Sequence, residues 1–430
     1  MRGGAWAAAM NASAPSGRQT GASTRRRSPL DPLLGVAAPL FQKILDRIDT
    51  GLVAGSIETT LPDGRVRLLG GRKPGPAAIV RLASWRALLR LATRGSVGWY
   101  LGWSLGEWSS PDLVALFELF VLNRTTLGNA GRASGLTRRL QQAWHRMRAN
   151  SRTGSRRNIE FHYDLGNDFY SLWLDATMSY SSALFAEPLS AAQKLEDAQA
   201  AKLASILDRT GTAPGDTILE IGCGWGSFVE VAARAGRAVH GITLSAEQKR
   251  AVEARAKGLG LGGVSVSLTD YRDVTGVFDA VASIEMVEAV GQAFWPEYLA
   301  AIARALKPGG RAALQYIAID DAIFEAYAGN VDFIQRYVFP GGMLISESRF
   351  RAIAAAHGLE WHNRRGFGLH YAETLRRWRV AFDAVVAEGR LPARFGNDFI
   401  GLWRYYLMYC EGGFRGGGID VAQVTLVKAG

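Results

Sequence analysis

The sequence predicts an α/β protein built on a doubly wound, mostly parallel sheet, preceded by a small mixed domain. From about residue 159, short apolar strands alternate with amphipathic helices, the pattern of a parallel sheet covered on both faces. A glycine-rich turn follows the first strand, where open α/β sheets bind ligands. We expect a disordered tail over 1–28, a small domain over 29–128, a basic linker or arm over 129–158 and the sheet domain over 159–430.

The amino-terminal part combines helix and hairpin signals. Residues 1–28 are rich in Gly, Ala, Ser and Arg, and bury too little apolar surface to offset chain entropy. Helical spacing of Leu40, Ile44 and Ile48 is followed by a hairpin signal around Leu61-Pro-Asp-Gly64. A small mixed domain is therefore expected before the sheet.

The composition of the chain indicates its cellular compartment and the kind of partner it binds. The net charge of +11 favours polyanionic partners, either nucleic acid or anionic lipid. The two cysteines, Cys223 and Cys410, match neither a disulfide framework nor a zinc site, which favours a reducing cytoplasm and no bound metal. No secretory signal and no run of 18 apolar residues is found, so membrane contact is expected to be peripheral, at the inner face.

A basic segment separates the two predicted domains. Residues 119–159 hold nine arginines and no acidic residue, and Leu136, Leu140, Trp144 and Met147 recur among them at helical spacing. A solvated linker and a basic amphipathic arm on an anionic membrane both fit this pattern. No nucleic-acid-binding motif accompanies it, so we expect a membrane partner and no nucleic acid.

The sheet domain opens with a helix near Ala192–Asp208, and a terminal strand at Ile419–Val427 is expected at a mixed edge. Between them, apolar runs predict five strands in chain order: Thr217–Ile221, Ala238–Ile242, Val264–Ser267, Asp279–Ser283 and Ala312–Tyr316.

The first strand ends in Glu220 and runs into Gly222, Gly224 and Gly226. Glycine allows the backbone to turn sharply and to lie against a ligand. Dinucleotide enzymes favour G-x-G-x-x-G, whereas G-x-G-x-G after an acidic strand end resembles the methyltransferase motif, which binds S-adenosylmethionine. A purely structural turn is the alternative interpretation.

Later strand ends add to this prediction. Thr243 and Leu244 close the second strand, and Gln248 follows one turn into a helix for which Ser245 is an ordinary N-cap. After the third strand, Asp270 and Tyr271 offer a carboxylate and an aromatic face for the adenine. The segment Leu306-Lys-Pro-Gly-Gly310 adds a turn common in such folds.

Six further motifs lie within residues 159–430: Phe161–Tyr170, Met178–Ser181, Glu285–Gly291, Tyr337–Gly342, Tyr371 with Trp378, and Tyr405–Phe414. Together they closely resemble the cyclopropane-fatty-acyl-phospholipid synthase family, which includes the mycolic acid cyclopropane synthases. The resemblance implies a class I methyltransferase-like fold with an added helical lipid-binding cap, and a homodimer. It also implies methyl transfer from S-adenosylmethionine to a double bond in an acyl chain of membrane phospholipid.

The resemblance also assigns residues. Tyr163, Tyr180 and Ser181 would cover the cofactor, with Gly222, Gly224, Thr243, Leu244 and Gln248 beneath it and Tyr271 stacked on the adenine. In the resembling enzymes a bicarbonate ion acts as base, and the positions that would hold it here are Ser182, Glu288, Gln315, Ile317 and Tyr371.

This sequence departs from the family at the predicted bicarbonate site. Ser182 stands where the family has Cys, and Gln315 stands where it has His. Gln315 keeps an amide donor but cannot carry the charge of an imidazolium. Glu288 is the expected carboxylate, although nearby Glu285 could equally be the buried partner.

Four functions remain open at this point. A cyclopropane fatty acid is the family's usual product, and a methyl-branched unsaturated chain is the alternative that the altered positions Ser182 and Gln315 suggest. Proton loss from the new methyl group closes the ring, whereas loss from a neighbouring carbon leaves an alkene. A small-molecule N-methyltransferase and a catalytically silent lipid-binding protein are the other two.

Overall fold

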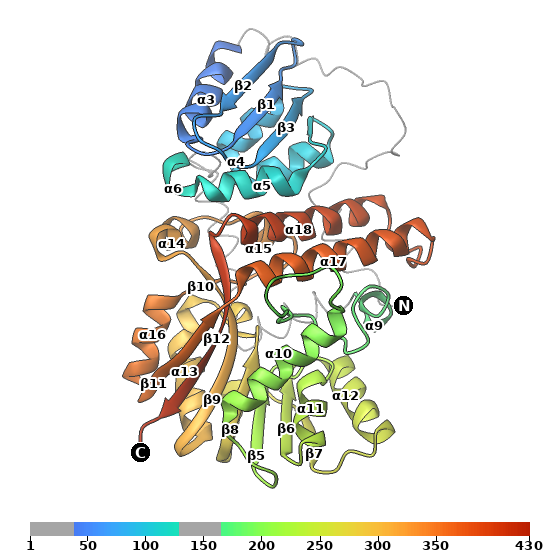
Figure 1. Cartoon of the computed structure of the whole chain (residues 1–430), viewed down its shortest axis with the longest axis vertical. Helices are drawn as coiled ribbons and strands as arrows, with labels where there is room; N and C mark the ends of the chain where they lie inside the picture. Colours follow the sequence, from blue (N-terminus) through green and yellow to red (C-terminus); the bar gives the residue numbers. More distant parts are fainter. Residues whose placement is uncertain (1–37, 129–164) are drawn as a thin grey trace. The chain divides into compact units, whose positions relative to one another are not determined.

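The computed structural model describes residues 38–128 and 165–430, which fall into two compact units (Figure 1). One unit contains residues 38–128 together with Ala326–Val338 and Val386–Gly418. The other contains the large sheet and spans 165–325, Phe339–Val385 and Ile419–Gly430. The predicted tail and the basic segment 129–158 lie outside the described residues.

The large sheet has the doubly wound α/β arrangement that the sequence predicts. Its strand order is β11-β12-β9-β8-β5-β6-β7, and the short β10 (Ile345–Ser346) pairs with β9. Strands β5 to β9 are parallel, whereas β12 is antiparallel to both of its neighbours. The bounds are β5 Thr217–Ile221, β6 Ala238–Thr243, β7 Val264–Leu268, β8 Phe278–Ile284, β9 Leu306–Ile319, β11 Leu359–Gly366 and β12 Ile419–Lys428.

Two details of the sheet differ from the prediction. The terminal strand β12 is not at the edge, because β11, which the apolar pattern did not reveal, pairs with its outer side. Strand β9 begins at Leu306, and its register against β8 shifts just before Arg311. Residues 306–310 are therefore an irregular strand start, not a separate turn.

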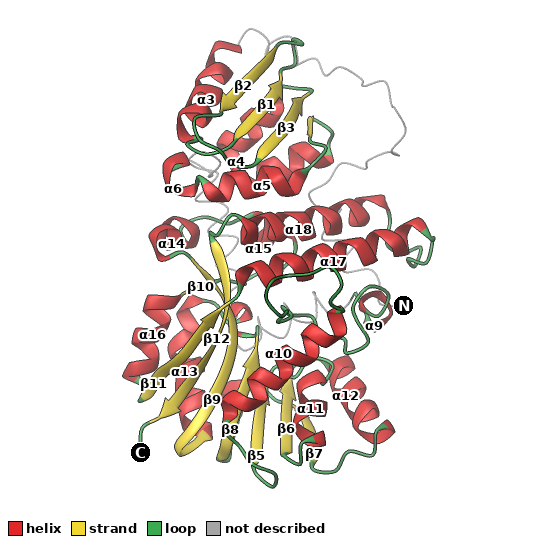
Figure 2. Ribbon diagram, in the orientation of Figure 1, coloured by secondary structure: helices red, strands yellow, loops and turns green. Residues whose placement is uncertain are grey.

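Helices cover both faces of the sheet (Figure 2). Helix α10 (Leu195–Thr210) packs on β8, β9 and β12, next to α11 (Ser227–Arg234), and α12 (Ala246–Gly258) packs on β6 and β7. On the opposite side, α13 (Trp295–Ala305) packs on β8 and β9 and on α16 (Glu347–Ala356). Between α10, α11 and the strands lies an apolar core that includes Ile206, Ile218, Phe228 and Val239.

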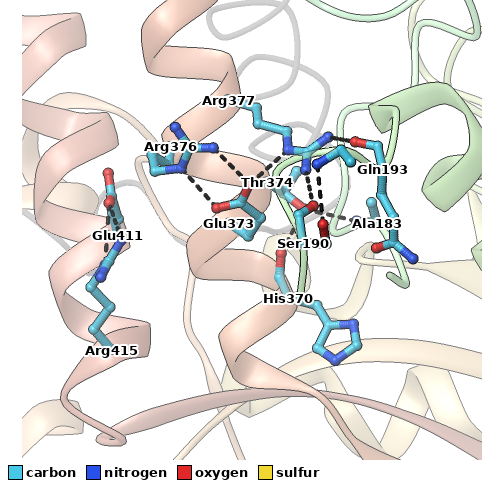
Figure 3. A network of polar contacts seen from close by, with 11 residues as sticks. Ala183, Ser190, Gln193, His370, Glu373, Thr374, Arg376, Arg377, Glu411 and Arg415 are labelled. Carbon is cyan, nitrogen blue, oxygen red and sulfur yellow. Dashed lines mark hydrogen bonds and ion pairs between the residues drawn. The ribbon is translucent and has the colours of Figure 1, made fainter. Parts of the chain in front are cut away.

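A helical cap belongs to the same unit. It comprises α9 (Asn167–Tyr170), the extended segment that follows it, and α17 (Gly368–Ala387). Figure 3 shows how α17 holds the segment: the Ala183 N–H donates to Thr374 Oγ1 at 3.1 Å, and Arg377 donates to the carbonyls of Ser190 and Gln193. His370 accepts from the Phe185 N–H at 3.0 Å, so this histidine has a structural partner.

The second unit is a small mixed domain. Its sheet has the order β2-β1-β3-β4, and β1 and β2 form the hairpin expected around Leu61-Pro-Asp-Gly64. Tyr405 on α18 packs against Tyr100 and Phe333, so parts of the carboxyl-terminal half complete its core. The elements are α3 Ala38–Gly51, β1 Ser56–Thr60, β2 Val66–Gly70, β3 Ala77–Leu82, α4 Arg86–Ser104, β4 Trp108–Ser109, α5 Leu113–Leu122, α6 Arg124–Leu127, α15 Phe333–Tyr337 and α18 Asn397–Arg415.

The remaining elements of the described residues are three 3₁₀ turns and one short helix. Three short 3₁₀ turns border the carboxyl ends of the strands: η1 (Tyr271–Asp273), η2 (Val287–Ala289) and η3 (Gln292–Phe294). Helix α14 (Asp321–Ala328) follows β9. Over 38–128 and 165–430, no helix combines the length and apolar character needed to cross a membrane.

Candidate active site

The predicted glycine loop links β5 to α11 at the carboxyl end of the sheet. Gly222, Gly224 and Gly226 all have positive φ, at 82°, 50° and 83°. A β-carbon at Gly222 would lie 2.7 Å from Met286, whereas one at Gly224 would meet no protein atom within 4 Å. The Gly224 backbone therefore borders open space that a ligand can enter.

That space is a cavity of about 160 Å³ at the ends of β5, β6 and β8. Ten of the twelve residues predicted to bind the cofactor line it. Of the other two, Gly226 lies beneath the loop against Val252, and Tyr163 lies outside the described residues. The ten lining residues are Tyr180, Ser181, Glu220, Gly222, Gly224, Thr243, Leu244, Gln248, Asp270 and Tyr271.

Two polar side-chain atoms at this cavity have no hydrogen-bond partner within the described residues. They are Glu220 Oε2 and Gln248 Nε2, and both atoms are buried. Gln248 is oriented by Thr243, whose hydroxyl donates to Gln248 Oε1 at 2.8 Å, and Ser245 caps the helix as predicted. An acceptor and a donor are thus left for the hydroxyl groups and ring nitrogens of a nucleoside.

Asp270 and Tyr271 lie at the end of β7, but the Asp270 carboxylate is already engaged. Arg272 donates to both of its oxygens at 2.8 Å, and the Arg272 side chain is almost fully buried. Tyr271 packs edge-on against Tyr298 with ring centroids 5.4 Å apart. The ion pair fixes this corner of the cavity, and Arg272, which the sequence analysis did not single out, also lines it.

A buried lysine at the cavity was also missed. Lys202 projects from α10, is 1% exposed, and donates to Ser181 Oγ at 2.7 Å. Burial lowers the pKa of Lys202 to about 8, and burial raises the pKa of Glu220 to about 8. The available signal was its place one turn after Ala198 and one turn before Ile206, on the buried face of the helix.

Next to the cavity, three of the five residues predicted to hold bicarbonate converge on Glu285. The Ser182 N–H and Gln315 Nε2 donate to Glu285 Oε1 at 2.8 and 2.7 Å, and Tyr371 Oη donates to Oε2 at 2.8 Å. The Ser182 hydroxyl instead donates to the Ala183 carbonyl. The structure therefore brings Ser182, Gln315 and Tyr371 together around a carboxylate of the chain itself.

Glu288 and Ile317 form a neighbouring pair. The Ile317 N–H donates to Glu288 Oε1, while Glu288 Oε2 has no hydrogen-bond partner in the part of the chain that the structure describes. Burial, reinforced by the nearby Glu285 carboxylate, raises the pKa of Glu288 to about 8. Glu288 thus lies beside the cluster but accepts no hydrogen bond from Ser182, Gln315 or Tyr371.

Comparisons with known proteins find relatives over most of the chain. The family described as mycolic acid cyclopropane synthetase matches residues 150–424. Tuberculostearic acid methyltransferase of Mycobacterium tuberculosis is 35% identical over 410 residues, 94% of this chain and 94% of the relative. Cyclopropane-fatty-acyl-phospholipid synthase of Escherichia coli K12 is 37% identical over 271 residues, 62% of this chain and 66% of the relative.

Solved structures agree on the fold. A mycolic acid cyclopropane synthase in complex with S-adenosylhomocysteine and CTAB is 30% identical, with a TM-score of 0.59 over 64% of this chain and 98% of that chain. Coclaurine N-methyltransferase, also bound to S-adenosylhomocysteine, has a TM-score of 0.60 over 76% of this chain and 98% of its own. At 21% identity, this second likeness shows the fold alone.

Proposed function

The chain belongs to the mycolic acid cyclopropane synthetase family and is an S-adenosylmethionine-dependent C-methyltransferase. We propose that it methylates a double bond of an unsaturated acyl chain in membrane phospholipid. The Escherichia coli relative, which is matched over 62% of this chain, carries this phospholipid acceptor in its name.

The proposal rests mainly on one observation: the predicted cofactor cavity adjoins the buried cluster in which Ser182, Gln315 and Tyr371 surround Glu285. The cavity fits S-adenosylmethionine, since Glu220 Oε2 and Gln248 Nε2 are unpaired within the described residues and Gly224 leaves room for a ligand. When bound, S-adenosylmethionine supplies an electrophilic methyl group. Glu285 lines the same cavity, so a proton acceptor lies beside the place where methyl transfer would occur.

The cap supplies the aromatic surroundings that this chemistry needs. Attack by an alkene leaves a positive charge on the acyl chain, and aromatic faces stabilise cations. Tyr180 lines the cavity, and its ring lies 5.4 Å from that of Trp378, which in turn packs edge-on against Tyr371. We assign these rings the role of excluding water and stabilising the cation.

The proposal leaves two products to distinguish. A methyl-branched unsaturated chain is favoured by the relative matched over 94% of this chain, which is named for a methyl-branched fatty acid, and by Ser182 and Gln315. A cyclopropane chain is the second candidate, because the family and the Escherichia coli relative carry that product in their names.

The test is incubation with methyl-labelled S-adenosylmethionine and vesicles of an anionic phospholipid with monounsaturated chains. Label is expected in the acyl chain, and saturated vesicles are the control. Mass spectrometry before and after catalytic hydrogenation separates the products, because the branched alkene takes up hydrogen and the ring does not under mild conditions. Label that appears equally with saturated lipid, or only on an added amine, would overturn the proposal.

We also propose that the enzyme works on the membrane surface as a peripheral protein. The net charge of +11 favours an anionic leaflet, where each basic residue contributes about 1 kcal/mol. Sedimentation with anionic vesicles at low salt should remove the protein from solution, and high salt should release it. Equal binding to neutral and anionic vesicles would contradict the electrostatic part of this proposal.

A further inference from the structure

The carboxylate of Glu285 occupies the centre of the cluster in which the family resemblance places a bicarbonate ion. Three donors, the Ser182 N–H, Gln315 Nε2 and Tyr371 Oη, point at its two oxygens. We propose that Glu285 is the base that accepts the substrate proton, in place of a free bicarbonate ion. This inference rests on the methyl transfer to an alkene proposed above.

A bicarbonate ion does not fit this arrangement. The donors through which Ser182, Gln315 and Tyr371 would hold it are already bonded to Glu285 at 2.7 to 2.8 Å. A second anion would have to displace this side chain or stay without those donors beside a buried negative charge, and both alternatives are unfavourable. The chain's own residues therefore supply the carboxylate.

Glu285 can reach a substrate from this position. It lines the cofactor cavity together with Glu220 and Ser181. A carboxylate accepts up to about four hydrogen bonds, and Oε2 receives only the one from Tyr371 within residues 38–128 and 165–430. A lone pair of Oε2 is thus left for a proton, while Gln315 and Ser182 hold Oε1.

The backbone at Glu285 indicates that its side chain is held there for function. Its φ is +49°, in the left-handed region that glycine adopts easily and residues with a β-carbon avoid. The Glu285 N–H donates to the Gln315 carbonyl at 2.8 Å, which fixes this conformation. Non-glycine residues in such conformations cluster at active sites.

The charges around Glu285 suit a base. Lys202 faces it from α10, Glu288 from η2, Tyr371 from α17 and Glu220 from β5. Burial raises the pKa of Glu285, and the hydrogen bonds from Gln315, Ser182 and Tyr371 together with the charge of Lys202 oppose that rise. A carboxylate with a raised pKa binds a proton more strongly than one in water.

In the proposed reaction a methyl group moves from sulfur to the alkene, and a proton then moves to Glu285. The π electron pair of the alkene forms a bond to the methyl carbon while the C–S bond breaks and its pair stays on sulfur. A C–H bond of the resulting cation then breaks, its proton forms an O–H bond with Glu285 Oε2, and its electron pair forms either the new double bond or the third bond of the ring. Glu285 returns the proton to solvent after product release.

Three variants of the full-length protein test the inference: Glu285→Gln, Glu285→Gly and, as a control, Glu253→Gln on α12. Glu253 is exposed and pairs with Lys249, away from the cavity. Gln keeps the shape of Glu285 but removes the basic oxygen. Gly suits the positive φ and frees the donors of Ser182, Gln315 and Tyr371 for an added anion.

Rates are measured with labelled cofactor and unsaturated vesicles in CO₂-free buffer, with and without added bicarbonate, alongside thermal unfolding and calorimetric cofactor binding. We expect a wild-type rate independent of bicarbonate, a loss of about 10²-fold or more for Glu285→Gln with cofactor binding retained, and no change for Glu253→Gln. Glu285→Gly should be inactive without bicarbonate and recover activity when it is added.

Two results would overturn the inference: a wild-type rate that depends on bicarbonate, or a Glu285→Gln variant that is folded and as fast as wild type. Failure of the proposed function looks different, because the wild type would then label no acyl chain under any buffer condition. A Glu285→Gln variant that also lost cofactor binding would likewise count against a role confined to the proton transfer.

Discussion

The side-chain amide of Gln423 on β12 donates to the amide oxygen of Gln315 on β9 at 3.0 Å, where the two residues are paired across the strands. Gln423 in turn accepts from Ser205 at 2.6 Å and from Arg209 at 3.1 Å. These donors fix which end of each amide is nitrogen. Gln315 Nε2 is therefore directed at Glu285 by residues that do not touch the cavity.

Gln423→Leu should break this chain of hydrogen bonds, which runs from Gln423 through Gln315 to Glu285. It leaves the buried Gln315 oxygen without its donor, which costs about 1–3 kcal/mol of folding free energy. Gln315 then becomes free to turn its amide, so kcat should fall while the dissociation constant of the cofactor stays nearly constant. Denaturant unfolding, rates and calorimetry measure the three quantities.

Ser205→Ala is the matched control for Gln423→Leu, because it removes one donor to Gln423 and leaves that of Arg209. Its effect on kcat should be much smaller. Equal losses of kcat in the two variants would contradict the idea that Gln423 acts by orienting Gln315.

Gly224→Ala tests the cofactor cavity. Its methyl group would clash with no protein atom but would enter the cavity, so we expect cofactor affinity to fall at least about tenfold. The positive φ also costs about 1 kcal/mol of stability. Calorimetric titration with S-adenosylhomocysteine and thermal unfolding separate these effects.

Gly215→Ala provides the control for that variant. Gly215 also has a positive φ, 95°, and open space at its β-carbon, but it does not line the cavity. It should lose stability similarly and keep its cofactor affinity. Weakened binding in both variants would place the Gly224 effect in the backbone and not in the cavity.

Much of the sheet could be predicted because its signals are local. Apolar runs and glycine turns give β5 and β6 almost to the residue, since parallel strands buried on both faces are continuously apolar. Strand β11 was missed because most of its residues are polar and exposed, so it lacks that pattern. The pairing of α18 with residues 38–128 depends on contacts distant in sequence, which periodicity cannot show.

The residues of the candidate site likewise include some that the sequence could predict and some that it could not. The glycine loop and strand ends follow from topology, and with Tyr180 and Ser181, which the family resemblance added, ten of the twelve predicted cofactor residues line one cavity. The sequence offered Glu285 only as an alternative to Glu288, which lies three residues later. The positive φ at Glu285 decides that its carboxylate, and not that of Glu288, is hydrogen-bonded to Ser182 and Tyr371. That backbone conformation is not visible in a sequence where the residue is not glycine.

Tyr371→Phe should act through Glu285. It removes the donor to Glu285 Oε2 but keeps the ring against Trp378. Since that hydrogen bond favours the ionised carboxylate, its loss raises the pKa of Glu285 further. The rate should fall roughly 10–100-fold.

The pH dependence is the diagnostic readout for Tyr371→Phe. A base must be ionised to accept a proton, so activity is lost as pH falls through the pKa of Glu285, and this acidic limb should move to higher pH in the variant. Cofactor affinity should change little. An unshifted acidic limb would mean that Tyr371 does not act on Glu285.

Glu288→Gln should stabilise the cofactor-free protein at neutral and higher pH. Burial raises the pKa of Glu288 to about 8 from an unfolded value near 4.5, so the folded state binds the proton more tightly. The stabilising contribution of the protonated group is complete below the unfolded pKa and is lost as pH rises toward 8. Gln keeps an oxygen for the Ile317 N–H and carries no charge.

For Glu288→Gln we expect a gain in the free energy of unfolding of about 1–3 kcal/mol at pH 8 that vanishes near pH 4, measured by denaturant unfolding at both pH values. A gain of equal size at pH 4 and pH 8 would show that the titration of Glu288 is not its cause.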